Sequence, residues 1–286
     1  MTLTAKIRES LILPFIVFMS ALTCAKLSAQ ELQYPLAIAA HGETIYLADL
    51  NLPGIWKSEE QKLSVYFQAS KTFRTPLNRP RCVAVDAEGR LYVGDSSTRE
   101  VYRFDDGGKP QPLTNSSIGI PMGIAVTADG NLLVSDLELH RIMKVKLAAD
   151  KKPVVEKYAE IPAPTGIALD GEERLWVVSR GPSPLWRVAR DGTAEKVIAD
   201  RAFEFPNAVA IGKEGTAYIA DGYAKAIWKV PAEGKPIKWV SDDPLVNPVG
   251  LTWQDDQLLI VDPRANGVFQ VDTEGKITAV DLGKAD

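Results

Sequence analysis

Residues 120–145 read IPMGIAVTADGNLLVSDLELHRIMKV and contain the pattern that decides the fold. Three short apolar runs alternate with turn-forming segments. The first run follows Pro121, which suits the first residue of a strand because no ladder donor is lost there. An Ala-Asp-Gly turn ends at Gly130, a residue that tolerates the positive φ of a tight turn. The stretch therefore predicts three short antiparallel strands.

The same pattern occurs six times, at intervals of 41 to 45 residues. The repeated proline is found at Pro35, Pro80, Pro121, Pro164, Pro206 and Pro248. Fourteen or fifteen residues later an aspartate, once replaced by serine, is found at Asp49, Asp95, Asp136, Ser179, Asp221 and Asp262. A four-stranded repeat of about 40–45 residues is typical of a propeller blade. The sequence therefore predicts an all-β fold, a six-bladed β-propeller of four-stranded antiparallel blades.

Two further positions keep the same register. A small residue follows each proline by two, at Ala37, Cys82, Gly123, Gly166, Ala208 and Gly250. A bulky residue stands seven positions after each repeat aspartate or serine, at Trp56, Tyr102, Met143, Trp186, Trp228 and Phe269. Innermost strands crowd around one axis and need small residues, while larger side chains fill the wedge where blades splay. We therefore expect the bulky row to be core and Cys82 to be a buried apolar residue.

The chain divides into residues 1–29 and a single propeller over 30–286, with blades starting near residues 34, 79, 120, 163, 205 and 247. Lys6 and Arg8 precede an apolar run that ends in a small-residue segment, which is typical of a secretory signal peptide. A membrane anchor is the alternative, but the run is shorter than a spanning helix needs and contains Pro14. We expect cleavage near Ala29 and an exported protein, periplasmic or extracellular.

The charge balance limits the partners. The whole chain has a net charge of −4, which becomes −6 without residues 1–29. Nucleic acid is therefore not expected as a partner, because phosphate binding needs clustered positive charge. No membrane contact is expected after signal cleavage. The last blade has its own outer strand, so we expect the ring to close by packing of the first blade on the sixth. Residues 30–33 could add a few ladder bonds to this closure.

The repeat Pro-x-Gly-Ile-Ala-Val, then Asp-Gly-x-Leu-x-Val-x-Asp and Arg-Ile-x-x-Val, resembles the NHL repeat. It is also similar to the repeat of the senescence-marker and gluconolactonase-like six-bladed propellers. The resemblance covers residues 33–282 and implies the fold. Such propellers include lactonases, lyases, scaffolds and binding modules, so the resemblance implies no single activity.

The lactonase branch of this group binds one divalent cation at the channel mouth. The resemblance places its ligands at a Glu two residues before the first proline and at Asn or Asp residues after later prolines, and oxygen ligands suit a hard cation. This chain has Gln33 at the Glu position and Val249 where that branch often has Asp. Asn207 is the only match, and it could instead cap the turn before its strand. We therefore predict no metal site and no cofactor; calcium is implied only if the protein is a lactonase.

Other catalytic groups are few. The two histidines, His41 and His140, are fewer than the three protein ligands of a typical catalytic zinc site. His140 could act as an acid or base, or be a solvated loop side chain. Ser179 lacks the Gly-x-Ser-x-Gly frame of a nucleophile. The repeat aspartates occur once in almost every blade, which is typical of structural residues.

Basic residues gather in the loops at one end of the expected ring. They follow the repeat aspartates or precede and follow the prolines, at Lys71, Arg74, Arg79, Arg81, Arg99, Arg180, Lys225 and Arg264. The opposite turns are rich in Asp and Glu, which are ordinary hairpin residues. Guanidinium groups suit carboxylates and phosphates. We therefore predict a channel-mouth site made by Tyr34, Arg79, Arg81, Arg180, Asn207, Asn247 and Arg264.

Three functional hypotheses follow. The first is a non-catalytic module that binds an anionic small molecule or an acidic peptide or protein segment on its Arg-bearing face. The second is a gluconolactonase-like, metal-dependent lactone hydrolase with a degenerate metal site. The third is a lyase.

Overall fold

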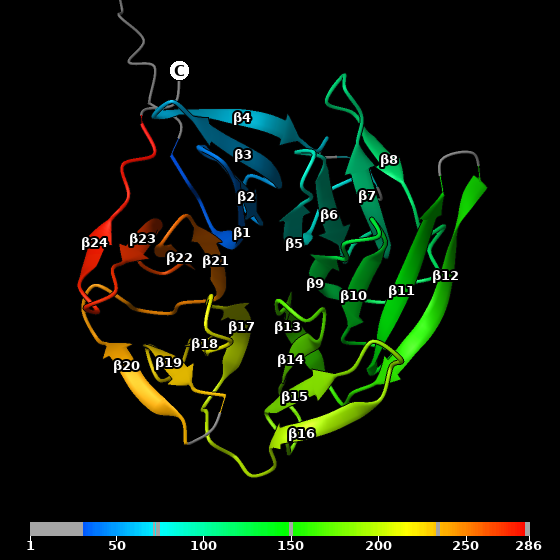
Figure 1. The fold of residues 1–286 in the computed structure, drawn as a ribbon. Helices are drawn as coiled ribbons and strands as arrows, with labels where there is room; N and C mark the ends of the chain where they lie inside the picture. Colours follow the sequence, from blue (N-terminus) through cyan, green and yellow to red (C-terminus); the bar gives the residue numbers. More distant parts are fainter. Residues whose placement is uncertain (1–30, 71, 73–74, 149–150, 233–234, 284–286) are drawn as a thin grey trace, which may run out of the picture.

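The computed structural model describes residues 31–70, 72, 75–148, 151–232 and 235–283. Six sheets surround a central axis, and each consists of four consecutive antiparallel strands (Figure 1). The predicted six-bladed propeller is confirmed. No helix in this part of the chain is long and apolar enough to cross a membrane. The predicted signal peptide, residues 1–29, lies outside the described residues.

Each blade runs from the channel outward in chain order. The first three blades are β1 Pro35–His41, β2 Thr44–Asp49, β3 Gly54–Glu59 and β4 Lys62–Gln68; β5 Pro80–Val85, β6 Leu91–Asp95, β7 Glu100–Phe104 and β8 Pro110–Pro112; and β9 Pro121–Val126, β10 Leu132–Asp136, β11 Arg141–Ala148 and β12 Lys151–Glu160. The last three are β13 Pro164–Leu169, β14 Leu175–Ser179, β15 Leu185–Val188 and β16 Ala194–Ile198; β17 Pro206–Ile211, β18 Ala217–Asp221, β19 Ala226–Val230 and β20 Ile237–Ser241; and β21 Gly250–Gln254, β22 Gln257–Asp262, β23 Gly267–Val271 and β24 Ile277–Ala279. Two prolines shorten β8 to three residues, since proline lacks the ladder donor.

The repeat aspartates are structural, as predicted. All five are fully buried, at Asp49, Asp95, Asp136, Asp221 and Asp262. The carboxylate of Asp49 accepts hydrogen bonds from the backbone N–H groups of Gln33 and Tyr34 and from the indole N–H of Trp56. Each carboxylate thus satisfies amides of the segment that leads into its own blade, which would otherwise be buried without a partner. In the fourth blade Ser179 replaces the aspartate. Its hydroxyl accepts from the Gly181 N–H and donates to the Pro162 carbonyl of the segment that leads into this blade.

The small residues of the inner strands are required by close contacts, as predicted. A Cβ on Gly166 would lie 2.4 Å from the Cα of Ala208 in the next blade. A Cβ on Gly250 would lie 2.5 Å from the Cγ1 of Val261. Cys82 occupies the same position, is buried, and has a thiol whose pKa burial raises to about 12. The bulky row lies on the third strands, where Trp56, Tyr102, Met143 and Phe269 are buried in the packing between blades.

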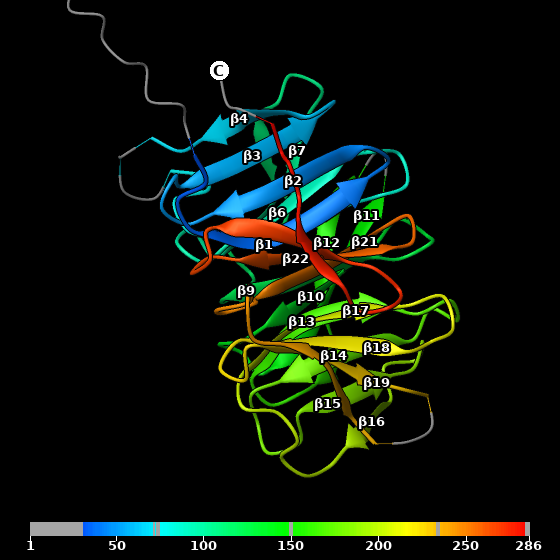
Figure 2. The same ribbon diagram turned by 90° about the vertical axis from the view of Figure 1, so that its left-hand side faces the viewer.

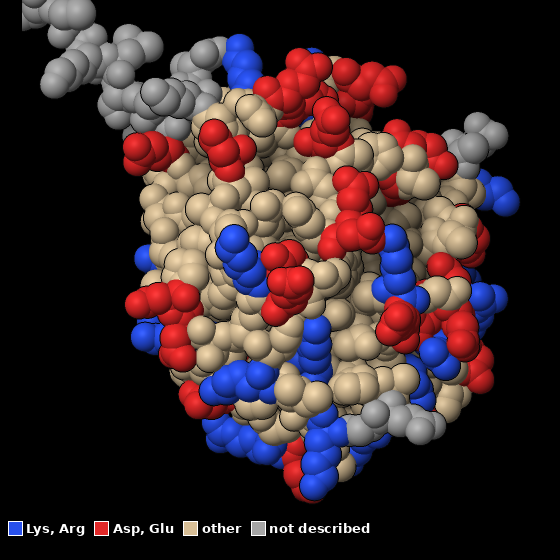
Figure 3. All heavy atoms as spheres, turned by 60° about the vertical axis from the view of Figure 1, so that its left-hand side comes forward, with Lys and Arg blue, Asp and Glu red and all other residues tan. Residues whose placement is uncertain are grey.

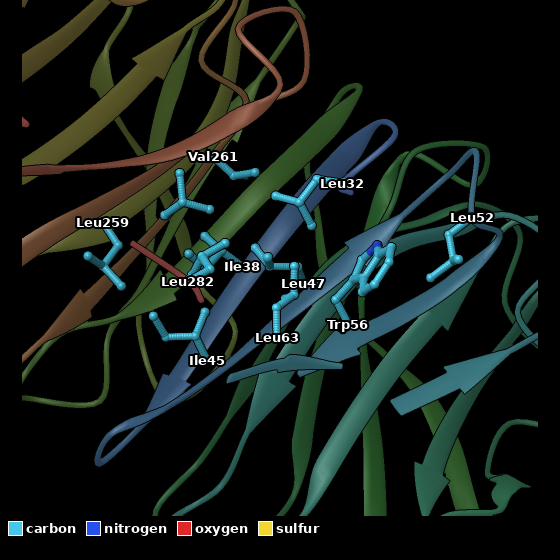
Figure 4. Packing of buried hydrophobic residues seen from close by; sticks show 11 residues of the cluster. Leu32, Ile38, Ile45, Leu47, Leu52, Trp56, Leu63, Leu259, Val261 and Leu282 are labelled. Carbon is cyan, nitrogen blue, oxygen red and sulfur yellow. The ribbon is translucent and has the colours of Figure 1, made fainter. Parts of the chain in front are cut away.

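The ring closes by packing, as predicted, and no strand of the described residues is exchanged between the first and last blades. Strand β1 lies beside β21 and β22 of the sixth blade (Figure 2). Leu32 and Leu282, near the two ends of the described chain, join one apolar cluster with Leu47 and Val261 (Figure 4). The Ser58 hydroxyl also donates to the Leu282 carbonyl at 3.0 Å. The seam between first and last blades therefore resembles the other blade interfaces.

The charge distribution is less simple than the sequence suggested. On the side shown in Figure 3, acidic side chains gather toward the β4 end of the ring and basic ones toward the end with β16 and β20. The turns expected to form an acidic face also contain Arg90 and Arg174, each bonded to a buried aspartate. On the Arg-bearing face, Arg99 pairs with Glu138. Neither face therefore carries charge of one sign alone.

Candidate binding site at the channel mouth

The inner strands enclose a central channel with a volume of about 410 Å³. The residues directly after the prolines form its mouth, and Leu36, Arg81, Met122, Asn207 and Val249 line it there. They reach the mouth because five of the prolines begin an inner strand at that end of the ring and Pro248 lies two residues before β21. Arg180 joins the lining from the loop after β14. The predicted residues Arg81, Arg180 and Asn207 are therefore brought together.

Arg81 is a half-buried side chain on β5. Its Nε donates to the Ser96 hydroxyl at 3.2 Å. Burial lowers the pKa of Arg81, the charge of Arg79 lowers it further, and the negative charge of Asp95 opposes the change. Tyr34 acts on this pKa in the same direction as Asp95, although Tyr34 does not line the channel. Arg81 thus carries its charge in a partly desolvated place, where electrostatic interactions are strong.

Arg180 crosses from the fourth blade to the fifth. Its Nη2 donates to the Asn207 Oδ1 at 2.7 Å, and its guanidinium carbon lies 4.2 Å from the centre of the Phe205 ring. Arg180 is exposed, yet desolvation lowers its pKa, and the charge of Arg81 lowers it further. The two guanidinium groups therefore share the mouth, and each makes the other less stable as a cation.

Two amide side chains approach one another next to Gly222, and of these Asn207 lines the channel while Asn247 does not. Asn207 donates from Nδ2 to the Phe205 carbonyl at 3.1 Å. A Cβ on Gly222 would lie 3.0 Å from that nitrogen and 2.5 Å from the Oδ1 of Asn247. Asn247 is only 9% exposed, and its side-chain amide makes no hydrogen bond within the described part of the chain. Glycine at 222 thus lets the two amides approach one another beside the mouth.

The remaining predicted residues lie farther out. Arg79 and Arg264 are exposed, and neither lines the channel. Their backbone N–H groups donate to Asp95 and Asp262, so both residues contribute to the hydrogen bonds that hold their loops. Lys71 and Arg74 of the basic set lie outside the described residues. His140 is exposed, and its Nδ1 accepts from the Ala163 N–H.

Sequence reasoning missed the aromatic support of Arg180. Phe205 packs under its guanidinium, and Tyr223 stacks on Phe205 with ring centres 4.5 Å apart and an angle of 16° between the planes. Phe205 directly precedes the fifth proline, and Tyr223 follows the fifth repeat aspartate by two residues. An aromatic residue at both positions of one blade was the available signal. The stack fixes Arg180 at the mouth.

The channel offers little acid–base chemistry. None of the described residues that line it is Asp, Glu or His. Cys82 is the only lining thiol there, and with a pKa near 12 it is protonated at neutral pH and is a weak nucleophile. The mouth also does not fit a divalent cation. Asn207 Oδ1 already accepts from Arg180, and two guanidinium groups repel a positive ion.

A search of curated proteins found no match. A gluconolactonase from Xanthomonas campestris superposes with a TM-score of 0.70 at 16% identity, covering 88% of each chain. A virginiamycin B lyase from Staphylococcus aureus gives 0.66 at 15% identity, covering 88% of this chain and 85% of that one. A chain of a nidogen/laminin complex gives 0.63 at 17%, covering 88% and 97%.

At such identities these likenesses show the fold alone, the six-bladed propeller that the repeat predicted. The sequence itself gives a narrower result. The Virginiamycin B lyase family profile matches residues 69–286, which is most of the chain and includes Arg81, Arg180 and Asn207. The chain belongs to the Virginiamycin B lyase family.

Proposed function

We propose that this propeller binds an anionic small molecule at the mouth of its channel. One observation carries the proposal: Arg81 and Arg180 both line the mouth, and no carboxylate of a described residue lines it with them. Desolvation and like charge lower the pKa of both groups, so the mouth holds two cations that are poorly stabilised. A bound anion would supply the missing counter-charge.

The chemistry of the donors indicates the kind of anion. Guanidinium groups present forked N–H donors that match carboxylate and phosphate oxygens. Arg81 uses its Nε on Ser96, and Arg180 uses one Nη2 hydrogen on Asn207, so further N–H groups of each remain available. Asn247 adds a side-chain amide without a partner in the described residues. A carboxylate or phosphate with neutral hydrogen-bonding groups therefore suits the mouth.

A metal-dependent lactone hydrolase is the second candidate, because a gluconolactonase shares the fold, and a lyase is the third, because the family is named for lyases. The hydrolase needs a cation site and an acid or base. The mouth has two guanidinium groups in place of a cation site, and His41 and His140 do not line the channel. The geometry thus supports binding over either lyase or hydrolase chemistry. Hydrolysis of sugar lactones that depends on added calcium would favour the hydrolase over the binding module.

Calorimetric titration tests the proposal with inorganic phosphate, gluconate, glucose 6-phosphate and an oligo-glutamate peptide as probes. We expect the wild type to bind one of the small anions, and Arg81→Ala and Arg180→Ala each to weaken that binding at least tenfold. Arg103→Ala, on β7 and outside the channel lining, is the control and should bind as the wild type. Absence of binding by all four probes would refute the proposal. Binding of the peptide alone would replace the small molecule by an acidic protein partner.

Export is proposed on the basis of the Lys6/Arg8 start and the apolar run that follows. The intact mass of the protein recovered from a secreting host decides the matter. We expect a product shortened by about 29 residues outside the cytoplasm, as the signal-peptide pattern implies. Recovery of the uncut chain from the cytoplasm would contradict the expectation.

A further inference from the structure

A second hollow lies next to the channel mouth, between the fourth and fifth blades, with a volume of about 470 Å³. Its walls come from the loop after β14 and from the segment leading into β17. Most of its lining is apolar, with Pro182, Pro184, Phe203 and Phe205 among the side chains. Arg180 lines both this hollow and the channel, so the two spaces share its side chain.

The walls of the hollow are fixed by the surrounding contacts. Phe203 is 3% exposed and packs edge-to-face on Trp228, with ring centres 5.6 Å apart. Phe205 is held between Arg180 and Tyr223. Arg201 donates to the carbonyls of Phe203 and Glu204, each at 3.4 Å. A hollow with fixed walls loses little conformational entropy when a ligand enters, which favours binding.

The shape and chemistry of the hollow differ from those of the mouth. The mouth presents two cations and an amide, whereas the hollow presents mainly proline rings and aromatic side chains, with Arg201 and Glu204 also in its lining and Arg180 shared with the mouth. A ligand whose anionic group contacts Arg180 would therefore have an apolar wall directly beside that group. Binding sites commonly combine an apolar hollow with a few polar groups in this way.

We propose that the channel mouth and the adjacent hollow form one extended site for an anion that bears an aromatic ring, with the anion at Arg81 and Arg180 and the ring among Pro182, Pro184 and Phe205. This inference rests on the proposed function and narrows its ligand class. Burial of one phenyl ring removes enough apolar surface from water to raise the affinity at least tenfold over the bare anion.

A matched pair of probes, phenyl phosphate and inorganic phosphate, tests the inference by calorimetry, with phenol as the neutral control. We expect phenyl phosphate to bind the wild type at least tenfold more tightly than inorganic phosphate. Pro182 is exposed, so Pro182→Trp should fill the hollow without disturbing the core. This variant should keep the affinity for inorganic phosphate and lose the advantage of phenyl phosphate. Pro112→Trp, at an exposed proline on β8, is the matched control. It should keep the affinity for inorganic phosphate and the advantage of phenyl phosphate.

The other outcomes are separable. Equal affinity of the wild type for the two phosphates overturns the inference and leaves the proposed function intact. An advantage that persists in Pro182→Trp overturns it as well, because the ring then binds elsewhere. If phenol binds as tightly as phenyl phosphate, the hollow is an apolar site independent of the anion, and the extended site is wrong. If neither phosphate nor phenyl phosphate binds, the proposed function fails for this anion class and the inference fails with it.

Discussion

Two pairs of arginines, at opposite ends of the ring, show two uses of the same side chain. Arg90 and Arg174 lie in the turns between the first and second strands of their blades, and each is bonded to a buried aspartate. Arg81 and Arg180 lie at the channel mouth, and neither pairs with a carboxylate of the described residues. The first pair has its counter-charge within the fold. The second pair has none among the described residues, and the proposed anion site rests on this difference.

The turn arginines follow a common local arrangement. The Asp170 carboxylate accepts from the backbone N–H and the Nε of Arg174, from the Glu172 N–H and from the indole N–H of Trp176. Asp86 makes the corresponding bonds with Arg90, and the Tyr92 hydroxyl replaces the indole. Each aspartate is therefore satisfied in a closed set of bonds, which stabilises the turn.

The largest effect is expected from removing one of these aspartates. Asp170→Ala leaves the indole N–H of Trp176 buried without its partner and frees Arg174, so we expect a loss of about 2–4 kcal/mol of unfolding free energy. Urea unfolding followed by fluorescence measures it. Glu172→Ala, which removes only an exposed partner of Arg174, should change stability by less than about 0.5 kcal/mol. Similar losses in the two variants would show that the buried carboxylate has no special role.

Exchange of a mouth arginine should separate stability from binding. Arg180→Gln should change the unfolding free energy by less than about 1 kcal/mol, because it removes a charge that lacks a carboxylate partner. It should lower anion affinity at least tenfold, which is about 1.4 kcal/mol. Arg174→Gln should do the reverse, with reduced stability and unchanged affinity. If Arg180→Gln proves as destabilising as Arg174→Gln, the mouth arginine is structural and the contrast between the two ends is lost.

Most of the fold could be predicted because its constraints repeat. Proline, small residue, aspartate and bulky residue stand in phase in six copies, and each position has one structural cause that acts in every blade. The short β8 could be predicted too, since Pro110 and Pro112 remove ladder donors.

The site was predicted less completely because its contacts occur once. Arg180 reaches Asn207 and Phe205 across a blade boundary, and no repeat predicts such a contact. Arg264 was expected at the mouth from its loop, yet a loop position does not fix the direction of a long side chain. The Asp-x-x-x-Arg-x-aromatic pattern at residues 86–92 and 170–176 was visible and remained unused.

Acid should weaken the turn end of the ring. Burial acts to raise the pKa of Asp86 and of Asp170, but hydrogen bonds from Arg90, Arg174 and their neighbours outweigh it, and both pKa values are lowered. A lowered pKa in the folded state gives stability that is full above the unfolded value of about 3.9 and is lost as pH falls through the folded value.

Unfolding by urea at pH 7, 5, 4 and 3 checks this expectation. The wild type should lose stability below about pH 4. Asp86→Asn and Asp170→Asn should each be less stable at pH 7 and lose less on acidification, because one titrating group is absent. A parallel loss in wild type and variants would assign the acid sensitivity to other carboxylates.

The smallest effect is expected at Arg264, which is exposed and outside the channel lining. Arg264→Ala should change anion affinity less than about twofold, because charges on an open surface are screened by salt. Titrations at about 0.05 and 0.5 M sodium chloride extend the test, since the Debye length falls several-fold over this range. The anion affinity of the wild type and that of Arg264→Ala should fall by the same factor as the salt concentration rises. A loss at Arg264→Ala as large as that at Arg81→Ala would enlarge the site toward the sixth blade.

The closure of the ring has a consequence for the connectivity of the chain. Each blade is built from one continuous segment, and Leu32 and Leu282 meet in one cluster at the seam. The position of the chain ends is thus independent of the way the blades pack. A circularly permuted chain, with the old ends joined by a short linker and new ends opened between the exposed residues Asp200 and Arg201 in the loop from β16 to β17, should form the same ring with the same mouth.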